Sequence, residues 1–247
     1  YLTKLANKLK VEIIEHKNYI GGRYSVLSEV GMLPTSLVGL NEKKFKQFNS
    51  LVKNKKFINA LVLNVGNIIF FLKKKKFNSI IINYDENSDD LFKWYQQLVS
   101  ESLGKKQKGL LTSISTMPKD NHSLMQLYLD GFKNNFYTFF FVNERSSKKI
   151  NKNYLLDNYS HLRNKKLIEI KLAQFNATKK VFNKKKIPFR SFFVKKRNEE
   201  ALGELFIFFI LETILLGKAL NVNPYDQPAV ELIKTETKKF LVSNNNF

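Results

Sequence analysis

Cysteine is absent from this sequence of 247 residues. Its absence excludes a disulfide framework and a thiolate metal site, and it is consistent with a reducing compartment. A glycine-rich phosphate loop of the P-loop type is also missing, as is any Cys/His spacing typical of metal ligands. We therefore expect no bound metal.

The sequence has no apolar run long enough to cross a bilayer. The longest run, LFIFFILETILL at 205–216, contains Glu212 and follows Glu204. It is shorter than the roughly 20 residues that a membrane-spanning helix needs, so it predicts a buried helix. No secretory signal is visible at the start of the sequence. We expect a cytoplasmic protein without a membrane partner.

Acidic residues are scarce: 21 Asp and Glu stand against 42 Lys and Arg, which gives a formal charge of +21. Such an excess is typical of proteins that bind nucleic acid or a membrane surface. The basic runs at 73–76, 184–186 and 195–197, however, lie at the ends of apolar segments and form no stripe interleaved with aromatic residues. This pattern favours solvated lysines that attract an anionic metabolite, and we expect no nucleic-acid partner.

The hydrophobic and aromatic residues of the sequence suffice for a large core. The sequence is 43% hydrophobic and 13% aromatic, and its length suits one large α/β domain or one domain plus part of another. It begins with Tyr1, and LTKLANKLKVEII has the pattern of the middle of a folded domain, so we expect a fragment of a longer protein. The pattern predicts a short helix, a strand at 11–14, a helix that stops near Pro34, and an amphipathic helix at 42–55.

From residue 58 onward, helical segments alternate with strand segments rich in β-branched and aromatic residues. Strands are predicted at 79–84, 109–116, 135–144 and 188–196, and helices at 58–72, 91–103, 122–132, 167–182, 201–220 and from Pro228 onward. Strands that alternate with helices predict a mainly parallel sheet covered by helices on both faces.

Two polar segments point to chemistry near the start and the middle of the sequence. The glycine pair before Arg23 lets backbone approach a ligand, and the guanidinium suits an anion, although an ordinary turn explains the same residues. Gln97 and Glu101 share one helix face, and Gly104 ends that helix, which places Glu101 in its last turn at the mouth of the sheet. A carboxylate there suits a general base; a solvated helix end is the alternative.

Two further segments lie in the second half of the sequence. Asp120 or Asn121 suits the cap of a helix, so that His122 falls in the first turn after a strand, a good position for acid–base chemistry. Lys234 lies two helical turns after Gln227, on nearly the same side of a helix. An ordinary surface histidine and one more exposed lysine are the alternatives.

Four longer segments contain these residues: GGRYSVLSEVGMLP at 21–34, QQLVSESLGK at 96–105, STMPKDNHSLMQLYLDG at 115–131 and NPYDQPAVELIK at 223–234. Taken in this order, they resemble the glucose-6-phosphate isomerase (phosphoglucose isomerase) family of the bacterial kind. The first segment is similar to that family's first signature, the middle two to its central catalytic stretch, and the last to its second signature. The resemblance spans nearly the whole sequence.

The resemblance implies a three-layer α/β/α sugar-isomerase (SIS) fold, a homodimer, and no metal or organic cofactor. It implies reversible interconversion of glucose 6-phosphate and fructose 6-phosphate, in glycolysis and gluconeogenesis, by ring opening and proton transfer through a cis-enediol. At matching positions, Glu101 corresponds to the base that moves a proton between C2 and C1. Arg23 corresponds to the residue that stabilises the developing enediolate, and Gly22 lies beside it.

The resemblance also assigns the remaining site residues. His122 and Lys234 correspond to the pair associated with ring opening, with His122 donated across the dimer interface. Gln97 and Gln227 correspond to amides that contact the substrate. The chemistry is consistent, because a C–H beside a carbonyl is a weak acid. A fixed carboxylate base and a cation near the enediolate oxygen therefore lower the barrier together.

The sequence departs from the family pattern at three points. Ala229 stands where many relatives have glycine, and Glu29 stands where small or neutral residues are common. The family's Ser/Thr-rich phosphate-binding cluster lies upstream of its first signature and has no counterpart here. We therefore expect the chain to carry about half of the active site and, alone, to lack most of the binding energy that positions the sugar.

These inferences predict a division of the chain into three parts. Residues 1–45 form the end of a first SIS domain and a connecting segment, 46–220 form a second SIS domain, and 221–247 form a loop and helix with Gln227 and Lys234. Two other functions stay open. One is a non-catalytic sugar-phosphate-binding SIS domain, which has no use for a base, and the other is a nucleic-acid-binding protein, for which only the charge argues.

Overall fold

The centre of the molecule is a parallel sheet. The computed structural model describes residues 1–143, 148–151 and 157–243. In this part of the chain the sheet has the strand order β2-β1-β3-β4, and every neighbouring pair is parallel. The strands are β1 (Asn78–Asn83), β2 (Leu111–Thr116), β3 (Asn135–Val142) and β4 (Phe189–Val194). All residues of β3 are buried, as expected for a central strand covered on both faces.

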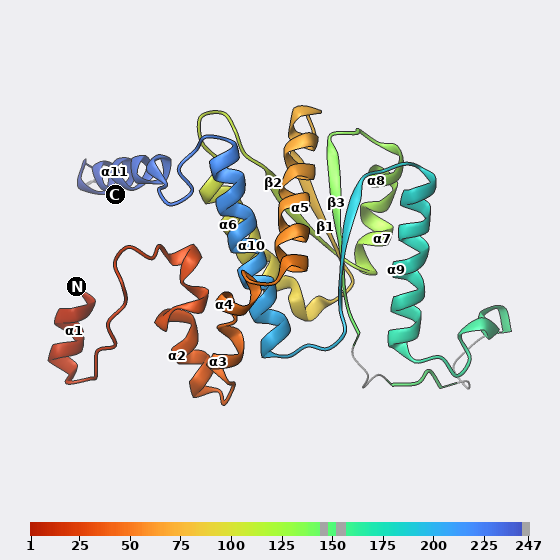
Figure 1. The fold of residues 1–247 in the computed structure, drawn as a ribbon, viewed down its shortest axis with the longest axis horizontal. Coiled ribbons are helices and arrows are strands. Elements are labelled where there is room, and N and C mark those ends of the chain that lie inside the picture. The colour runs from red at the N-terminus through yellow and green to blue at the C-terminus, as the bar shows by residue number, and fades with distance from the viewer. Residues whose placement is uncertain (144–147, 152–156, 244–247) are drawn as a thin grey trace.

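Helices cover both faces of this sheet (Figure 1). On one face lie α5 (Lys55–Lys73), α6 (Asp89–Leu103) and α10 (Glu199–Ala219); on the other lie α8 (Met125–Asp130) and α9 (Leu167–Lys184). Because side chains alternate along a strand, Ile81 packs in the first layer and its neighbour Ile82 in the second. The predicted three-layer α/β/α architecture is confirmed.

Most of the predicted elements from residue 58 onward are confirmed with shifts of a few residues at their ends. The strand predicted at 79–84 is β1, and the helix predicted at 201–220 is α10. The apolar run at 205–216 is a helix in the core, as predicted, and its Glu212 is completely buried. The helix predicted from Pro228 is α11 (Pro228–Ser243). Shorter elements are η2 (Glu86–Ser88) and η4 (Asp157–Leu162).

The amino-terminal region differs from two predictions. It begins with α1 (Leu2–Leu9), as predicted, but residues 11–14 form no strand. A strand needs a hydrogen-bonded neighbour, and the described residues give this segment none. The helix predicted to stop near Pro34 is α2 (Glu29–Leu37), which continues through the proline for three more residues. That prediction was therefore wrong, because the last turn forms without the missing N–H of the proline.

Two predicted helices are each broken into two short ones. The segment at 42–55 forms α3 (Glu42–Phe45) and α4 (Phe48–Leu51), with the backbone turning between them. Just before this turn the chain packs closely on α10, because a Cβ added to Gly203 would lie 2.4 Å from the Phe45 carbonyl oxygen. The segment at 122–132 is divided between α7 (Lys119–Ser123) and α8.

A buried polar cluster joins the helices of the first layer to the sheet. The Tyr95 hydroxyl of α6 donates to Glu212 Oε1 of α10 at 2.6 Å, and Arg190 of β4 and Asn64 of α5 donate to Oε2 of the same carboxylate. Arg190 Nε also donates to Thr138 Oγ1 of β3 at 2.8 Å. Burial, followed by the charge of Glu212, raises the pKa of Tyr95, so its hydroxyl remains a donor. The cluster therefore ties five elements together.

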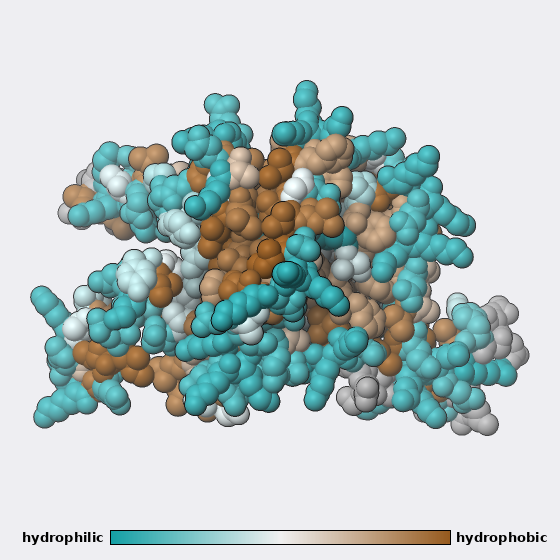
Figure 2. Space-filling model, in the orientation of Figure 1, coloured by the Kyte–Doolittle hydropathy of each residue, from teal (hydrophilic) through white to brown (hydrophobic). Residues whose placement is uncertain are grey.

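Helix α5 has one buried and one exposed apolar face. Phe57, Leu61, Val65 and Ile68 are among its buried residues, whereas its outer face is mostly exposed. Figure 2 shows an apolar area over α5 and α10 that hydrophilic side chains surround. By length and composition alone α5 is apolar enough to cross a membrane, and 22% of its apolar window is buried inside the protein. Here it packs on α10.

Candidate active site

Arg23 is the centre of the candidate site. It lies in η1 (Gly22–Leu27), a 3-10 helix that follows the glycine pair, and it is only 4% exposed. Its Nε donates to Ser102 Oγ at 2.9 Å. Its Nη1 donates to Glu101 Oε2 at 3.2 Å and to Gln227 Oε1 at 3.1 Å. Residues from the end of α6 and from the loop at 221–227 thus meet at the guanidinium of Arg23.

The loop between α10 and α11 accepts the remaining guanidinium protons. Arg23 Nη2 donates to the carbonyl oxygens of Pro224 at 2.8 Å and of Asp226 at 3.0 Å. All five N–H donors of Arg23 are therefore used by the protein itself. A substrate oxygen can reach this cation only by replacing one of the present acceptors.

Glu101 is held on both sides in the last turn of α6. One oxygen accepts from Arg23, and the other accepts from Gln97 Nε2 at 2.9 Å. The Glu101 side chain is 29% exposed, whereas that of Arg23 is 3% exposed. The predicted helix face with Gln97 and Glu101 is confirmed, and so is the helix end before Gly104. The arrangement gives a carboxylate that is fixed on two sides and open on a third.

Sequence reasoning assigned no role to several residues that support Arg23. Trp94 Nε1 donates to the Arg23 carbonyl at 2.9 Å. The Tyr24 hydroxyl lies 2.9 Å from Ser102 Oγ and donates to the Pro224 carbonyl at 3.1 Å. Burial raises the pKa of Tyr24. Their positions in the sequence could have indicated this role, because Tyr24 directly follows Arg23 and Ser102 directly follows Glu101.

Lys105 was also missed, and it anchors the loop that carries Gln227. Its Nζ lies 2.7 Å from Asp226 Oδ1 and 2.6 Å from the Asp226 carbonyl oxygen, and it also donates to the Asn223 carbonyl. The Lys105 side chain is only 12% exposed. The hydrogen bond from Lys105 is the largest of the effects that hold the pKa of Asp226 below its usual range. Lys105 thus binds the Asp226 carbonyl that also accepts from Arg23, and it holds the residue before Pro224.

A cavity of about 620 Å³ lies against this cluster. Glu101, Lys105 and Gln227 line it, together with residues from the start of α11. A Cβ on Gly22 would meet nothing within 4 Å, so open space adjoins the backbone beside Arg23. The volume is in the range of small-molecule sites. A base, a cation and an amide therefore surround a space that suits a small substrate.

The candidate site does not lie at the carboxyl edge of the sheet, where Glu101 was predicted. In the parallel fold, α6 starts beside the end of β1 and runs back toward the start of β2, so its last turn is at the amino edge. The prediction placed the carboxyl end of α6 at the edge where the parallel strands end. A helix that follows a strand runs back, so its carboxyl end lies at the opposite edge. The predicted position of Glu101 at the mouth of the sheet was therefore wrong, and its catalytic role stays a prediction.

His122 lies at the opposite, carboxyl edge of the sheet. At that edge Thr116 Oγ1, the end of β2, donates to the carboxylate of Asp89 at 2.9 Å, and Thr116 N donates to Asp120 at 2.9 Å. Pro118 is the N-cap of α7, so Asp120 and Asn121 both lie inside the helix and neither caps it, contrary to prediction. His122 belongs to the same short helix and is exposed. Glu101 comes twelve residues after Asp89 in α6, which is about 18 Å along the helix axis.

Lys234 also lies apart from the Arg23 cluster. Its Nζ pairs with Glu231 Oε1 at 2.7 Å on α11, and its side chain is 63% exposed. Figure 1 shows α11 extending away from the layered body. The structure thus brings together four of the predicted site residues, and it leaves His122 and Lys234 outside that group. Within the described ranges no group of His, Asp and Glu suits a metal ion.

Comparisons with known proteins agree in the family they indicate. A family model described as phosphoglucose isomerase matches residues 7–246. A glucose-6-phosphate isomerase of Mycoplasmopsis pulmonis (strain UAB CTIP) is 34% identical, over 96% of this chain and 59% of that protein. A probable glucose-6-phosphate isomerase of Methanococcus maripaludis is 33% identical, over 93% of this chain and 52% of that protein. The chain thus spans a little more than half the length of these curated relatives.

Solved structures with the same fold are also known. A hypothetical protein from Thermus thermophilus superposes with a TM-score of 0.87 at 25% identity, over 97% of this chain and 60% of that chain. A glucose-6-phosphate isomerase from Chlamydia trachomatis superposes with a TM-score of 0.74 at 16% identity, over 97% of this chain and 51% of that chain. At that identity the second comparison speaks for the fold alone.

Proposed function

The chain belongs to the phosphoglucose isomerase family, and we propose that the protein from which it comes interconverts glucose 6-phosphate and fructose 6-phosphate. One observation carries the proposal. Glu101, Arg23 and Gln227, which are up to 204 residues apart, converge beside a cavity of small-molecule size. A proton transfer at a carbon next to a carbonyl needs a base at the proton and a cation near the carbonyl oxygen, and Glu101 and Arg23 are such a base and such a cation.

In this proposal Glu101 is the base that moves the proton between C2 and C1 through a cis-enediol. Gln97 orients one of its oxygens and Arg23 the other. When Glu101 takes the proton, its negative charge passes to the substrate oxygen. The Nη1 group of Arg23 then has a better acceptor on the substrate than on the neutral carboxyl, so the cation stabilises the enediolate.

The remaining residues contribute to binding and ring opening. We assign Gln227 and Gln97 to contacts with the substrate, and Gly22 to close approach of the backbone, because open space adjoins it. His122 and Lys234 open the sugar ring by moving protons at the ring oxygen and the C1 oxygen.

The separation of His122 from Glu101 supports a homodimer. About 18 Å of α6 lies between the two edges of the sheet, so one chain does not complete the site. A second copy that places its own His122 at the cavity of the first does complete it. Phosphate binding is assigned to a part of the protein outside this sequence, consistent with the predicted division at residues 45 and 220. We further propose a SIS fold and a cytoplasmic location.

The test is a coupled assay of fructose 6-phosphate conversion with the protein in its full length. We expect activity in the wild type, and a loss of kcat of about 100- to 10,000-fold in Glu101→Gln, the contribution typical of a general base. Gln keeps the size and the hydrogen-bonding capacity, so substrate binding should change little. Full-length protein that binds glucose 6-phosphate without turnover would support the alternative, a non-catalytic sugar-phosphate-binding domain.

A further inference from the structure

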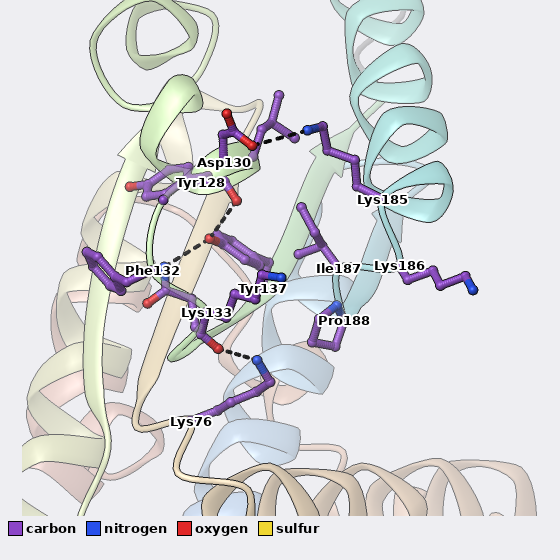
Figure 3. Close-up of a pocket in the computed structure, with 13 residues that line it drawn as sticks. Lys76, Tyr128, Asp130, Phe132, Lys133, Tyr137, Lys185, Lys186, Ile187 and Pro188 are labelled. Carbon is purple, nitrogen blue, oxygen red and sulfur yellow. Dashed lines mark hydrogen bonds and ion pairs between the residues drawn. The ribbon is translucent and has the colours of Figure 1, made fainter.

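A second cavity lies between α8, α9 and the starts of β3 and β4. It has a volume of about 460 Å³ and shares no residue with the cavity beside Glu101. Figure 3 shows its walls, which include Tyr128, Phe132, Ile187 and Pro188. None of the four signature-like segments explains why lysines gather around it.

The polar groups deep in this cavity are already paired with one another. Tyr137 donates its hydroxyl proton to the Tyr128 carbonyl at 3.3 Å, and Asn135 Nδ2 donates to the Tyr137 hydroxyl oxygen at 3.0 Å. Both Tyr137 and Asn135 are buried. The floor is therefore rigid and neutral, and the charge of the cavity comes from its rim.

The rim is strongly positive. Lys76, Lys133, Lys185 and Lys186 line the cavity, and Asp130 is the one carboxylate among the lining residues. Asp130 pairs with Lys185 at 3.7 Å. Figure 3 shows the Lys186 side chain extending away from the others. Lys76 and Lys133 thus remain as two cations without a carboxylate partner among the residues of the cavity.

These two lysines lie close together. Lys76 Nζ donates to the carbonyl oxygen of Lys133. Burial, and then the positive charge of Lys133, lower the pKa of Lys76. A lysine near the end of a helix offsets the helix dipole, which accounts for Lys185 at the end of α9. It does not account for Lys76, whose ammonium group lies against the backbone of Lys133 in another loop, or for the position of both lysines on the rim of one cavity.

We propose that this cavity binds a small phosphate monoester, with the phosphate between Lys76 and Lys133 and the organic part against Tyr128 and Phe132. A phosphate monoester carries a charge of about −1.5 to −2 at pH 7, which matches two cations, whereas a carboxylate matches one. The volume accommodates a single small molecule. The site is independent of the proposed isomerisation, because it uses none of the same residues.

Calorimetric titration of the 247-residue chain with inorganic phosphate, at an ionic strength held constant with sodium chloride, tests this site. We expect saturable binding that becomes about tenfold weaker or more in Lys76→Gln/Lys133→Gln, which corresponds to about 1.4 kcal/mol. The matched control is Lys56→Gln/Lys180→Gln, which removes the same charge from exposed positions and should change the Kd little. An equal loss in both double variants, or no saturable binding, overturns the proposal.

A second measurement needs no variant. Acetylation of lysines in the wild-type chain, followed by mass spectrometry, should show that phosphate protects Lys76 and Lys133 but not Lys56 and Lys180. Protection that is the same at all four lysines would mean general attraction of anions to a chain of charge +21, and the proposed site would be wrong.

Discussion

At the scale of single residues, the candidate site depends on how Arg23 is held. Its five N–H donors have five acceptors, of which two are backbone carbonyls of the loop at 221–227. Sequence patterns alone do not reveal this arrangement. The spacing of Gln97 and Glu101 predicted that they share a helix face, but their meeting with Arg23 and Gln227 depends on the tertiary fold.

Lys105→Met should loosen that loop. The change keeps the length of the side chain but removes the cation that binds Asp226 and the Asn223 carbonyl. Trp94 is the single tryptophan, and its indole donates to the Arg23 carbonyl, so its fluorescence reports on the site. We expect a shifted emission maximum in Lys105→Met and none in Lys56→Met, whose lysine is exposed. Identical spectra for both variants would contradict this role of Lys105.

The same loop should respond to acid. The folded pKa of Asp226 is lowered, chiefly by the hydrogen bond from Lys105. A carboxyl group with a lowered folded pKa adds stability above its unfolded pKa, and that stability is lost as the pH falls through its folded pKa. In Lys105→Met the acid-induced change in Trp94 fluorescence should therefore occur at a higher pH than in the wild type. An unchanged midpoint in an acid titration would count against the argument.

Gly22→Ala should change substrate binding without changing the stability of the fold. No atom lies within 4 Å of an added Cβ, and the backbone of Gly22 is not left-handed, so the fold should tolerate alanine. We expect the free energy of unfolding to change by less than about 0.5 kcal/mol. KM in the full-length protein should rise, because the methyl group occupies space assigned to the substrate. An unchanged KM would show that Gly22 is not part of the substrate-binding site.

At the scale of elements, the sequence predicted repeating patterns better than interruptions. The strand with Ile80–Ile82 and the long helix α10 were found because each contains a continuous apolar run that is typical of a fully buried element. The breaks inside 42–55 and 122–132 were missed. The first adjoins a close tertiary contact of Phe45 with Gly203, which local sequence does not specify. The segment at 11–14 has strand-forming residues, but a strand depends on a neighbour that local sequence does not specify.

The buried cluster around Glu212 gives a prediction at this scale. Glu212 is fully buried in α10, and Arg190 of β4 depends on its charge. Glu212→Gln keeps the shape but leaves the arginine without a buried counter-charge. We expect a loss of about 3–5 kcal/mol in the free energy of unfolding.

Urea denaturation monitored by circular dichroism measures this loss. Glu231→Gln is a suitable control, because its ion pair with Lys234 is exposed and should be worth less than about 1 kcal/mol. Similar losses in the two variants would mean that Glu212 does not hold the layers together.

At the scale of the whole molecule, the position of His122 relative to Glu101 is decisive. The resemblance placed both residues in one predicted catalytic set. The direction of α6 shows that they lie at opposite edges of the sheet. The resemblance to a known family implies a homodimer, and the proposed homodimer would remove the conflict. No periodicity or spacing in the sequence would have done so.

Mixed dimers test the proposed arrangement. Full-length Glu101→Gln and His122→Gln should each be nearly inactive. When equal amounts are unfolded together and refolded, half of the dimers should contain one of each chain, and each such dimer has one intact site of two. We expect about a quarter of the wild-type activity, measured by the coupled assay. Activity no higher than that of the separate variants would show that one chain supplies both residues.

The length of α6, which separates Glu101 from His122 within one chain, bears on how the activity depends on protein concentration. A catalytic set divided between two copies exists only while the copies are associated, so turnover per chain follows the law of mass action. Diluting the full-length protein below the dissociation constant of the dimer should lower its specific activity, and concentration should restore it. A helix of 15 residues would thus make the abundance of the protein itself a regulator of its activity.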